Sequence, residues 1–178
     1  MALFRTIALY MATLMALVAC SISIDAQVAS SVGQSASISV SITMEKDILV
    51  VGQKPRAIVT VKNISGQEIC FSTASRLYRV HVEGKDGERS KTEYHRHLHG
   101  DFRSGDGPVV EDGPVICRDI ASGASDVQTY DLSAFYDLSA PGKYSVYIEI
   151  YDPLGPKEGN GIWLRTNTAK FELRAPTQ

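Results

Sequence analysis

The sequence predicts an all-β protein, with a single antiparallel β-sandwich of about seven strands over residues 37–175. The strongest observation is the strict alternation of apolar and polar residues from 144 to 151, which is typical of a strand with one face in a core. Several other short segments alternate in the same way and end at turns rich in Gly, Pro, Asn or Asp. No segment carries a convincing amphipathic helical pattern, so helices are not expected. The central strand is expected to bury Tyr144, Val146, Ile148 and Ile150.

The start of the chain is expected to be a targeting segment. A lone cation, Arg5, precedes an apolar run from residue 7 to 18, which is short for a membrane span and typical of a signal peptide. The sequence Leu-Val-Ala-Cys at its end resembles a bacterial lipobox, which predicts a signal peptide of residues 1–19 and a lipid on Cys20. The alternative is ordinary cleavage that removes residues 1–26. Residues 20–36 are rich in Ser, Ala and Val and predict a flexible tether.

Both cleavage sites predict export, either to the periplasm, as an outer-membrane or cell-surface lipoprotein, or as a secreted protein. Membrane contact is expected only through the lipid anchor. The cysteines agree with export, because Cys70 and Cys117 remain as an even pair once Cys20 is lipidated or removed, and a disulfide is the default in an oxidising compartment. Neither cysteine has the neighbours of a zinc motif.

The first half of the domain contains five segments that read as strands or short apolar pieces. The turn after the third is supplied by Asn63 and Ser65-Gly66, and Asn63-Ile64-Ser65 also matches a glycosylation sequon. In the fourth, Ile69 and Phe71 point inward on either side of Cys70. The fifth precedes a predicted hairpin turn at residues 84–87. The five segments are residues 37–44, 47–51, 56–64, 67–72 and 77–83.

The second half is less regular. Residues 91–102 suit either the return strand of the hairpin or a loop, and residues 152–161, DPLGPKEGNG, are expected to form a loop. Strands are expected at 115–120, 127–132, 144–151 and 162–174. The turn at residues 141–143 delivers Tyr144 to the first position of its strand, where the phenol can bury its ring and bond nearby backbone as a tyrosine corner.

These motifs together resemble the immunoglobulin-like (Ig-like) sandwiches of bacterial secreted proteins. The resemblance rests on Gly52-Gln53-Lys54-Pro55 before a strand, on DLSAFYDLSAPGKYSV at residues 131–146, and on Arg165-Thr166-Asn167 before the last strand. The middle motif is also similar to the β-sandwich that precedes the catalytic domain of lysine-specific metalloendopeptidases. The resemblance implies an Ig-like fold and transfers no catalytic residue, since the zinc motif HExxH of those peptidases is absent.

The histidine cluster is the sharpest local motif. In an extended chain, His95, His97 and His99 would lie on one face, where their ring nitrogens could share one zinc or copper ion, with Asp101 as a nearby fourth ligand. The alternative is a solvated polar segment whose histidines titrate but bind nothing in particular.

The sequence favours a binding function over catalysis. There is no GxSxG motif and no catalytic constellation, so the chain is not expected to be an enzyme, and a net charge of −2 spread along the chain argues against nucleic-acid partners. Tyr147, Tyr151 and Trp163 could form a recognition surface or pack under a second layer. The leading hypothesis is a non-enzymatic binding or accessory module that recognises a protein or another envelope component. The alternatives are a metal-binding envelope protein and a secreted protease inhibitor acting through residues 105–113 or 152–161.

Overall fold

The computed structural model describes residues 37–72, 77–101, 103–106, 117–157 and 160–177. The predicted all-β fold is confirmed, and one of its two main sheets is antiparallel with the strand order β1-β3-β8. Its strands are β1 (Ile38–Met44), β3 (Arg56–Asn63) and β8 (Ser125–Asp131). The signal peptide, Cys20 and the tether at 20–36 lie outside the described residues. Within the described part of the chain, no helix is long and apolar enough to cross a membrane.

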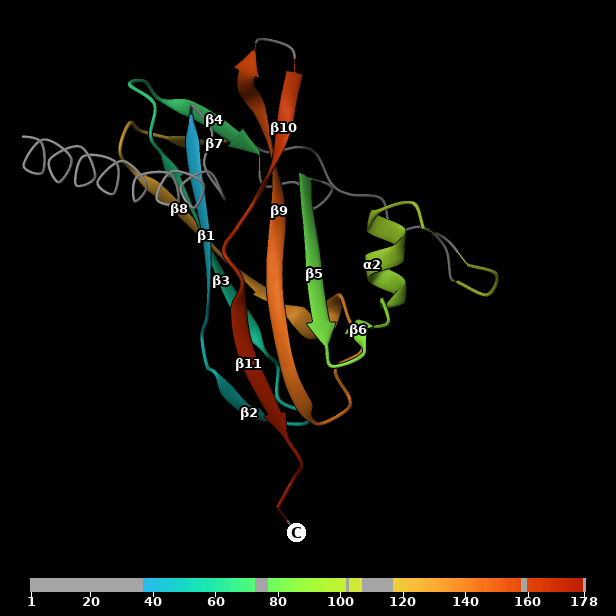
Figure 1. Ribbon diagram of the computed structural model, residues 1–178. Coiled ribbons are helices and arrows are strands. Elements are labelled where there is room, and N and C mark those ends of the chain that lie inside the picture. The colour runs from blue at the N-terminus through green and yellow to red at the C-terminus, as the bar shows by residue number, and fades with distance from the viewer. Residues whose placement is uncertain (1–36, 73–76, 102, 107–116, 158–159, 178) are drawn as a thin grey trace, which may run out of the picture. The chain divides into compact units, whose positions relative to one another are not determined.

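The second main sheet has the strand order β2-β11-β9-β5-β6, and β10 pairs with the distal part of β9 (Figure 1). All its pairings are antiparallel except that of β2 with β11. Three strands on one side and the β5, β9 and β11 trio on the other reproduce the two sheets of an Ig-like domain. The strands are β2 (Ile48–Val50), β5 (Tyr78–Gly84), β6 (Gly87–Glu88), β9 (Gly142–Lys157), β10 (Asn160–Arg165) and β11 (Ala169–Arg174).

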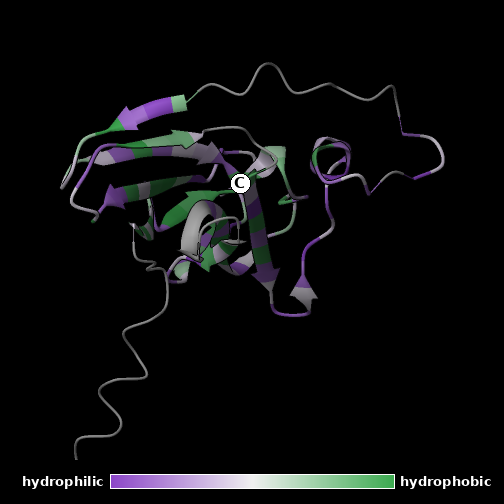
Figure 2. Ribbon diagram, turned by 90° about the horizontal axis from the view of Figure 1, so that it is seen from above, coloured by the Kyte–Doolittle hydropathy of each residue, from purple (hydrophilic) through white to green (hydrophobic). Residues whose placement is uncertain are grey.

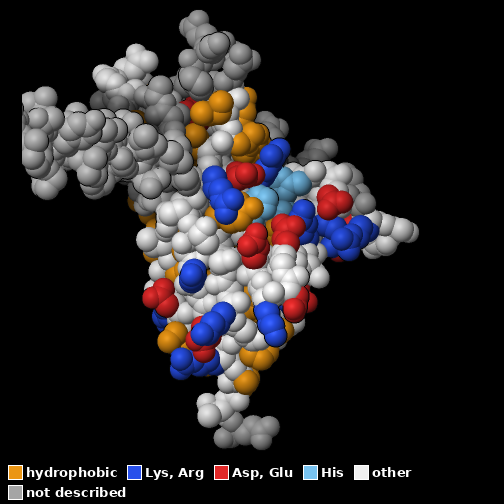
Figure 3. Space-filling view, in the orientation of Figure 1, with side chains coloured by type: hydrophobic (Ala, Val, Ile, Leu, Met, Phe, Trp, Pro, Cys, Tyr) orange, Lys and Arg blue, Asp and Glu red, His pale blue; other side chains and the backbone are white. Residues whose placement is uncertain are grey.

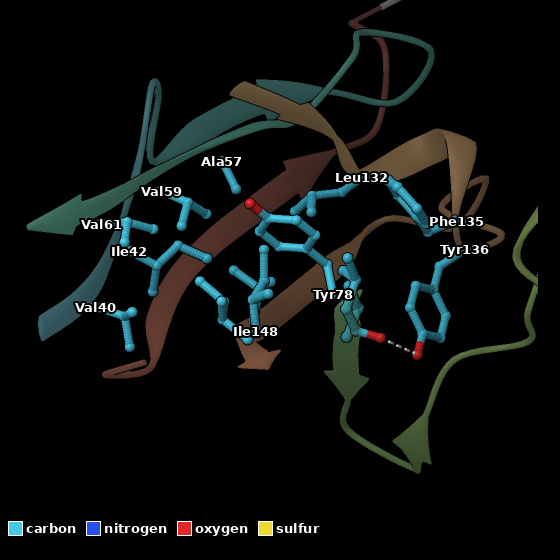
Figure 4. Close-up of a cluster of buried hydrophobic side chains, with 14 of the residues drawn as sticks. Val40, Ile42, Ala57, Val59, Val61, Tyr78, Leu132, Phe135, Tyr136 and Ile148 are labelled. Carbon is cyan, nitrogen blue, oxygen red and sulfur yellow. Dashed lines mark hydrogen bonds between the residues drawn. The ribbon is translucent and has the colours of Figure 1, made fainter. Parts of the chain in front are cut away.

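The core lies between the two sheets and follows from the alternation that the sequence shows. Val146, Ile148 and Ile150 of β9 have no exposed surface, and side chains of β1 and β3 meet them from the other sheet (Figure 4). Figure 2 shows the same alternation of apolar and polar residues along the strands. Each such side chain contributes roughly 1.5–3 kcal/mol of transfer free energy when it is fully buried.

A third, two-stranded ribbon pairs β4 (Ile69–Ser72) with β7 (Cys117–Ile120). The predicted disulfide joins Cys70 to Cys117, with 5.4 Å between their Cα atoms. Both cysteines lie on the exposed side of the ribbon, while Ile69, Phe71 and Ile120 are buried on its inner side. The ribbon is therefore fastened on one face by the disulfide and on the other by the core.

Tyr144 forms the tyrosine corner. Its ring is only 5% exposed and stacks on Phe171, with 5.2 Å between ring centroids. Its hydroxyl donates a hydrogen bond of 2.7 Å to the carbonyl oxygen of Ala140, just upstream of β9. The bond fixes the chain where it turns into the central strand.

Replacing Tyr144 with Phe removes this hydrogen bond and leaves the ring in place. The free energy of unfolding is expected to fall by about 1 kcal/mol, the usual net value of one such bond. Urea unfolding followed by circular dichroism measures it. The matched control is Tyr147→Phe on the outer face of the same strand, where the described residues offer the hydroxyl no hydrogen-bond partner, and a change below about 0.5 kcal/mol is expected.

Residues 152–161 differ from the prediction, because β9 continues to Lys157 and β10 begins at Asn160, so most of the expected loop is hairpin. The expected final strand is also split into β10 and β11. Thr166 and Asn167 cause the break, since the Thr166 hydroxyl accepts the amide of Ile148 at 3.0 Å. The Asn167 side chain exchanges two 2.9 Å hydrogen bonds with the backbone of Ile42 on β1. These side chains replace ladder bonds and link the two sheets at one edge.

Residues 91–102 were expected to be strand or loop, and this expectation is wrong. They contain the short helix α2 (Glu93–Leu98), which lies beyond β5 and β6 in Figure 1. Thr92 is its N-cap: its hydroxyl accepts the amide of His95 at 3.2 Å and donates to the carbonyl of Ala134 at 2.6 Å. A helix this short is stable only through such tertiary contacts, which the sequence pattern does not reveal.

Candidate functional site

The outer face of the second sheet carries a continuous set of aromatic and charged side chains near its β10 end. Three strands supply them: β5, β9 and β10. Figure 3 shows hydrophobic, cationic, acidic and histidine side chains gathered together on this face. We define the aromatic-arginine surface as Arg79, His81, Tyr147, Glu149, Tyr151, Trp163 and Arg165.

Tyr147 lies at the centre of this surface between two planar side chains. The His81 ring is nearly parallel to it, at 11° and 4.5 Å between centroids. The guanidinium carbon of Arg165 lies 3.5 Å from the centre of the same ring. His81 comes from β5 and Arg165 from β10, on opposite sides of β9, so both faces of the Tyr147 ring are covered. Its partial burial also raises the pKa of the phenol, which keeps it neutral.

A second group of contacts surrounds Trp163. The guanidinium carbon of Arg79 lies 3.9 Å from the centre of the indole, and the Tyr151 ring packs at 5.4 Å between centroids. Gly161, beside a shift in the β9–β10 register, leaves room for the Tyr151 ring, because a Cβ atom there would overlap that ring. The glycine is thus required by a close approach and not by its backbone dihedral.

Glu149 lies between the two groups and links them. Its carboxylate is 3.3 Å from Nε2 of His81 and 4.0 Å from the guanidinium of Arg79. Nδ1 of His81 lies 3.6 Å from Glu88 on the other side. For Arg165, the described residues provide no acidic partner within salt-bridge distance. The surface is therefore ordered by stacking and carries an arginine whose charge is not neutralised by a described acid.

The predicted recognition residues Tyr147, Tyr151 and Trp163 are brought to one face. The sequence analysis placed the outward side of β5 in water but missed the role of Arg79 and His81. Their alternation gave the face on which they lie. Only the strand register pairs His81 with Tyr147, and register between distant strands is not encoded locally.

The histidine cluster is divided by α2. His95 and His99 lie one helical turn apart with 4.9 Å between ring centroids, whereas Nε2 of His97 lies 3.9 Å from both Glu93 and Asp106. Asp101 is exposed beyond the end of the helix. The three imidazoles therefore do not share one face, as the extended conformation required. Within the described residues, no three His, Cys, Asp or Glu side chains converge as a metal site.

Two titratable groups are perturbed around α2. Burial, then the neighbouring His99, lower the pKa of His95 from 6.5 to about 4. Hydrogen bonds from Arg96 lower the pKa of Asp106 from 3.8 to about 2. His95 is therefore neutral and Asp106 ionised at physiological pH.

Folding stability is expected to fall as the pH drops from 6.5 to 4, because the unfolded chain then binds a proton at His95 that the folded chain excludes. The loss is roughly 2 kcal/mol, and urea unfolding at stepped pH measures it. His95→Gln keeps a donor for the neighbouring carbonyl and is expected to flatten the profile in this window. Asp106 acts separately, since its contribution is lost only between about pH 4 and pH 2. A wild-type profile that is flat from pH 6.5 to 4 would contradict the assignment.

The loops considered for protease inhibition are only partly visible. Residues 107–113 lie outside the described residues, and residues 152–157 and 160–161 are strand.

Comparisons with known proteins return neither a matching family model nor a matching curated protein. Three solved structures resemble the chain at low identity. The alkylpurine DNA glycosylase AlkC of Pseudomonas fluorescens matches at 12% identity and TM-score 0.39, over 79% of this chain and 31% of the glycosylase. A CARDB domain from Pyrococcus furiosus matches at 13% identity and TM-score 0.34, over 78% of this chain and 95% of that domain. A PapD-like domain of human CEP192 matches at 14% identity and TM-score 0.39, over 80% and 89%.

The chain thus spans about a third of the glycosylase. The fold assignment stands on the strand pairings described above. The resemblance to the metalloendopeptidase sandwich is not shown by these comparisons.

Proposed function

We propose that this chain is a non-enzymatic binding module of the cell envelope, and that it docks a partner protein on the aromatic-arginine surface. The observation that carries the proposal is the ordered stack of Tyr, Trp and Arg side chains on a sheet face that no described element covers. These three residue types are the ones most enriched at the energetic centres of protein interfaces. Side chains that are already ordered lose less conformational entropy when a partner binds.

A protein fits this surface better than a sugar does. Stacking on a sugar ring needs an open aromatic face, but both faces of Tyr147 are covered and Arg79 covers one face of Trp163. The charge favours a partner that presents carboxylates, because the surface has two arginines and one glutamate. Binding is accordingly expected to weaken as the salt concentration rises.

Export and lipid anchoring at Cys20 belong to the same proposal. They are supported by the apolar leader, by the lipobox-like sequence and by the disulfide, which is typical of oxidising compartments. Mass spectrometry of the mature N-terminus tests the anchor. A diacylated Cys20 is expected, whereas a mature protein that begins at Gln27 would replace the anchored form with a secreted one.

The docking face is tested by cross-linking and then by affinity. A photoreactive residue at Ser145, on the same face next to the surface, is introduced into the full chain in its own cells, with Thr129 on the outer face of β8 as the control position. The cross-linked partner is identified, purified and titrated against the wild type, Arg165→Glu and Thr129→Glu. We expect at least a tenfold loss for Arg165→Glu and less than a twofold change for Thr129→Glu.

Equal affinity of wild type and Arg165→Glu, or cross-linking from residue 129 alone, would overturn the proposal. Thermal unfolding of each variant separates loss of binding from loss of folding. Glycan binding that falls in Trp163→Ala, without any protein partner, would instead reassign the surface to carbohydrate.

A further inference from the structure

The helix α2 leaves two of the three clustered histidines side by side. His95 and His99 are four residues apart, and their rings meet edge to face at 4.9 Å between centroids. Two imidazoles at this spacing on a helix can bind the same metal ion. His97 turns away toward Glu93 and Asp106, so it cannot join them.

The ring of His95 is held as a metal-binding histidine usually is. Its Nδ1 atom lies 3.2 Å from the carbonyl oxygen of Phe135. A carbonyl oxygen only accepts hydrogen bonds, so Nδ1 carries the proton and Nε2 keeps its lone pair. A backbone carbonyl in this position is the common second partner of a ligating histidine, because it fixes the tautomer and the ring orientation. For Nε2, the described residues provide no hydrogen-bond partner.

Both histidines line a small pocket of about 190 Å³ between α2 and the β5–β6 hairpin. His81, Glu88 and Tyr136 line it too, and the Tyr136 hydroxyl lies 2.7 Å from the Glu88 carboxylate. Glu88 supplies a negative charge, although Arg79 and Lys91 also border the pocket. The Arg79 guanidinium is drawn aside over Trp163. The pocket has room for an ion and its water ligands beside the two rings.

We propose that Nε2 of His95 and the imidazole of His99 chelate one divalent transition-metal ion, with water at the remaining coordination positions. The two imidazole ligands suit copper and zinc, and the general affinity order for divalent ions predicts that Cu²⁺ binds more tightly than Zn²⁺. The site differs from the three-histidine arrangement expected from the sequence, because His97 and Asp101 take no part. It is independent of the proposed docking function.

The neutral state of His95 supports this assignment, because a protonated imidazole cannot bind a metal ion. Burial keeps this ring neutral at physiological pH.

The test is calorimetric titration of the purified mature protein with CuCl₂ and ZnCl₂ at neutral pH. The wild type is expected to bind one Cu²⁺, and His99→Ala to bind it at least tenfold more weakly. His97→Ala, two residues away on the other side of the helix, is the matched control and is expected to change the affinity less than twofold. Thermal unfolding establishes that both variants fold.

Electron paramagnetic resonance of the copper-loaded wild type provides a readout that does not depend on any variant. Its hyperfine structure is expected to report two imidazole nitrogens. Failure to bind Cu²⁺, an equal loss in His97→Ala and His99→Ala, or a signal from one or three imidazoles would each overturn the two-histidine site.

Discussion

Replacing Cys70 and Cys117 together by serine is expected to lower the free energy of unfolding by about 4 kcal/mol, since the disulfide closes a long loop in the unfolded chain. The two cysteines are 47 residues apart, and the loop contains β5, β6 and α2. Without the bond the unfolded chain gains conformational entropy, and the ribbon of β4 and β7 loses its outer fastening. A two-stranded ribbon is marginal in isolation, so its strands are expected to open first.

Urea unfolding of the wild type and the double variant measures this loss. Dithiothreitol is expected to bring the wild type to the stability of the double variant and to leave the variant unchanged, which is the internal control. A loss below about 1 kcal/mol would show that the disulfide adds little to the fold. Hydrogen exchange locates the effect, with faster exchange expected first at amides of Ile69–Ser72 and Cys117–Ile120.

Replacing Asn63 with Leu is expected to cost about 3 kcal/mol. The side chain has no exposed surface, and its amide nitrogen donates 2.8 Å hydrogen bonds to the carbonyls of Gln67 and Ile120. Its oxygen accepts from the backbone and hydroxyl of Ser65. Leucine would leave these groups without partners in a buried site, and each orphaned group costs about 1–3 kcal/mol.

Urea unfolding again gives the magnitude. Gln67→Leu is the matched control, because it makes the same kind of change at an exposed position of the same turn, and it is expected to change stability by less than about 0.5 kcal/mol. Similar losses in the two variants would mean that the hydrogen bonds of Asn63 contribute nothing specific. The same bonds bear on the sequon at residues 63–65, since in the folded protein the Asn63 amide is buried and unavailable for glycosylation.

The disulfide and Asn63 are expected to be coupled. Asn63 holds the carbonyl of Ile120 on β7, the same strand that begins at Cys117. Once the disulfide is gone and the ribbon opens more readily, losing the Asn63 bonds should cost less. A double-mutant cycle is expected to give a coupling of about 1 kcal/mol, and strict additivity would show that the two fastenings act on separate parts of the fold.

The sequence by itself determined the architecture. Alternation with a period of two assigned the buried face of β1, β3, β5, β9 and β11, because a strand places successive side chains on opposite faces. The turn before Tyr144 and the pairing of Cys70 with Cys117 were also readable, since both depend on residue types with few structural uses. These features need no knowledge of which strand lies beside which.

Only the tertiary structure decided the features that carry function. Residues 93–98 are helical because Thr92 and His95 bond the segment that precedes β9, a contact 40 residues distant in sequence. The stack of His81, Tyr147 and Arg165 exists because β5 and β10 flank β9 in one particular register. The physical reason is the same in both cases: local sequence fixes which face of an element is apolar, whereas long-range packing fixes which polar side chains meet.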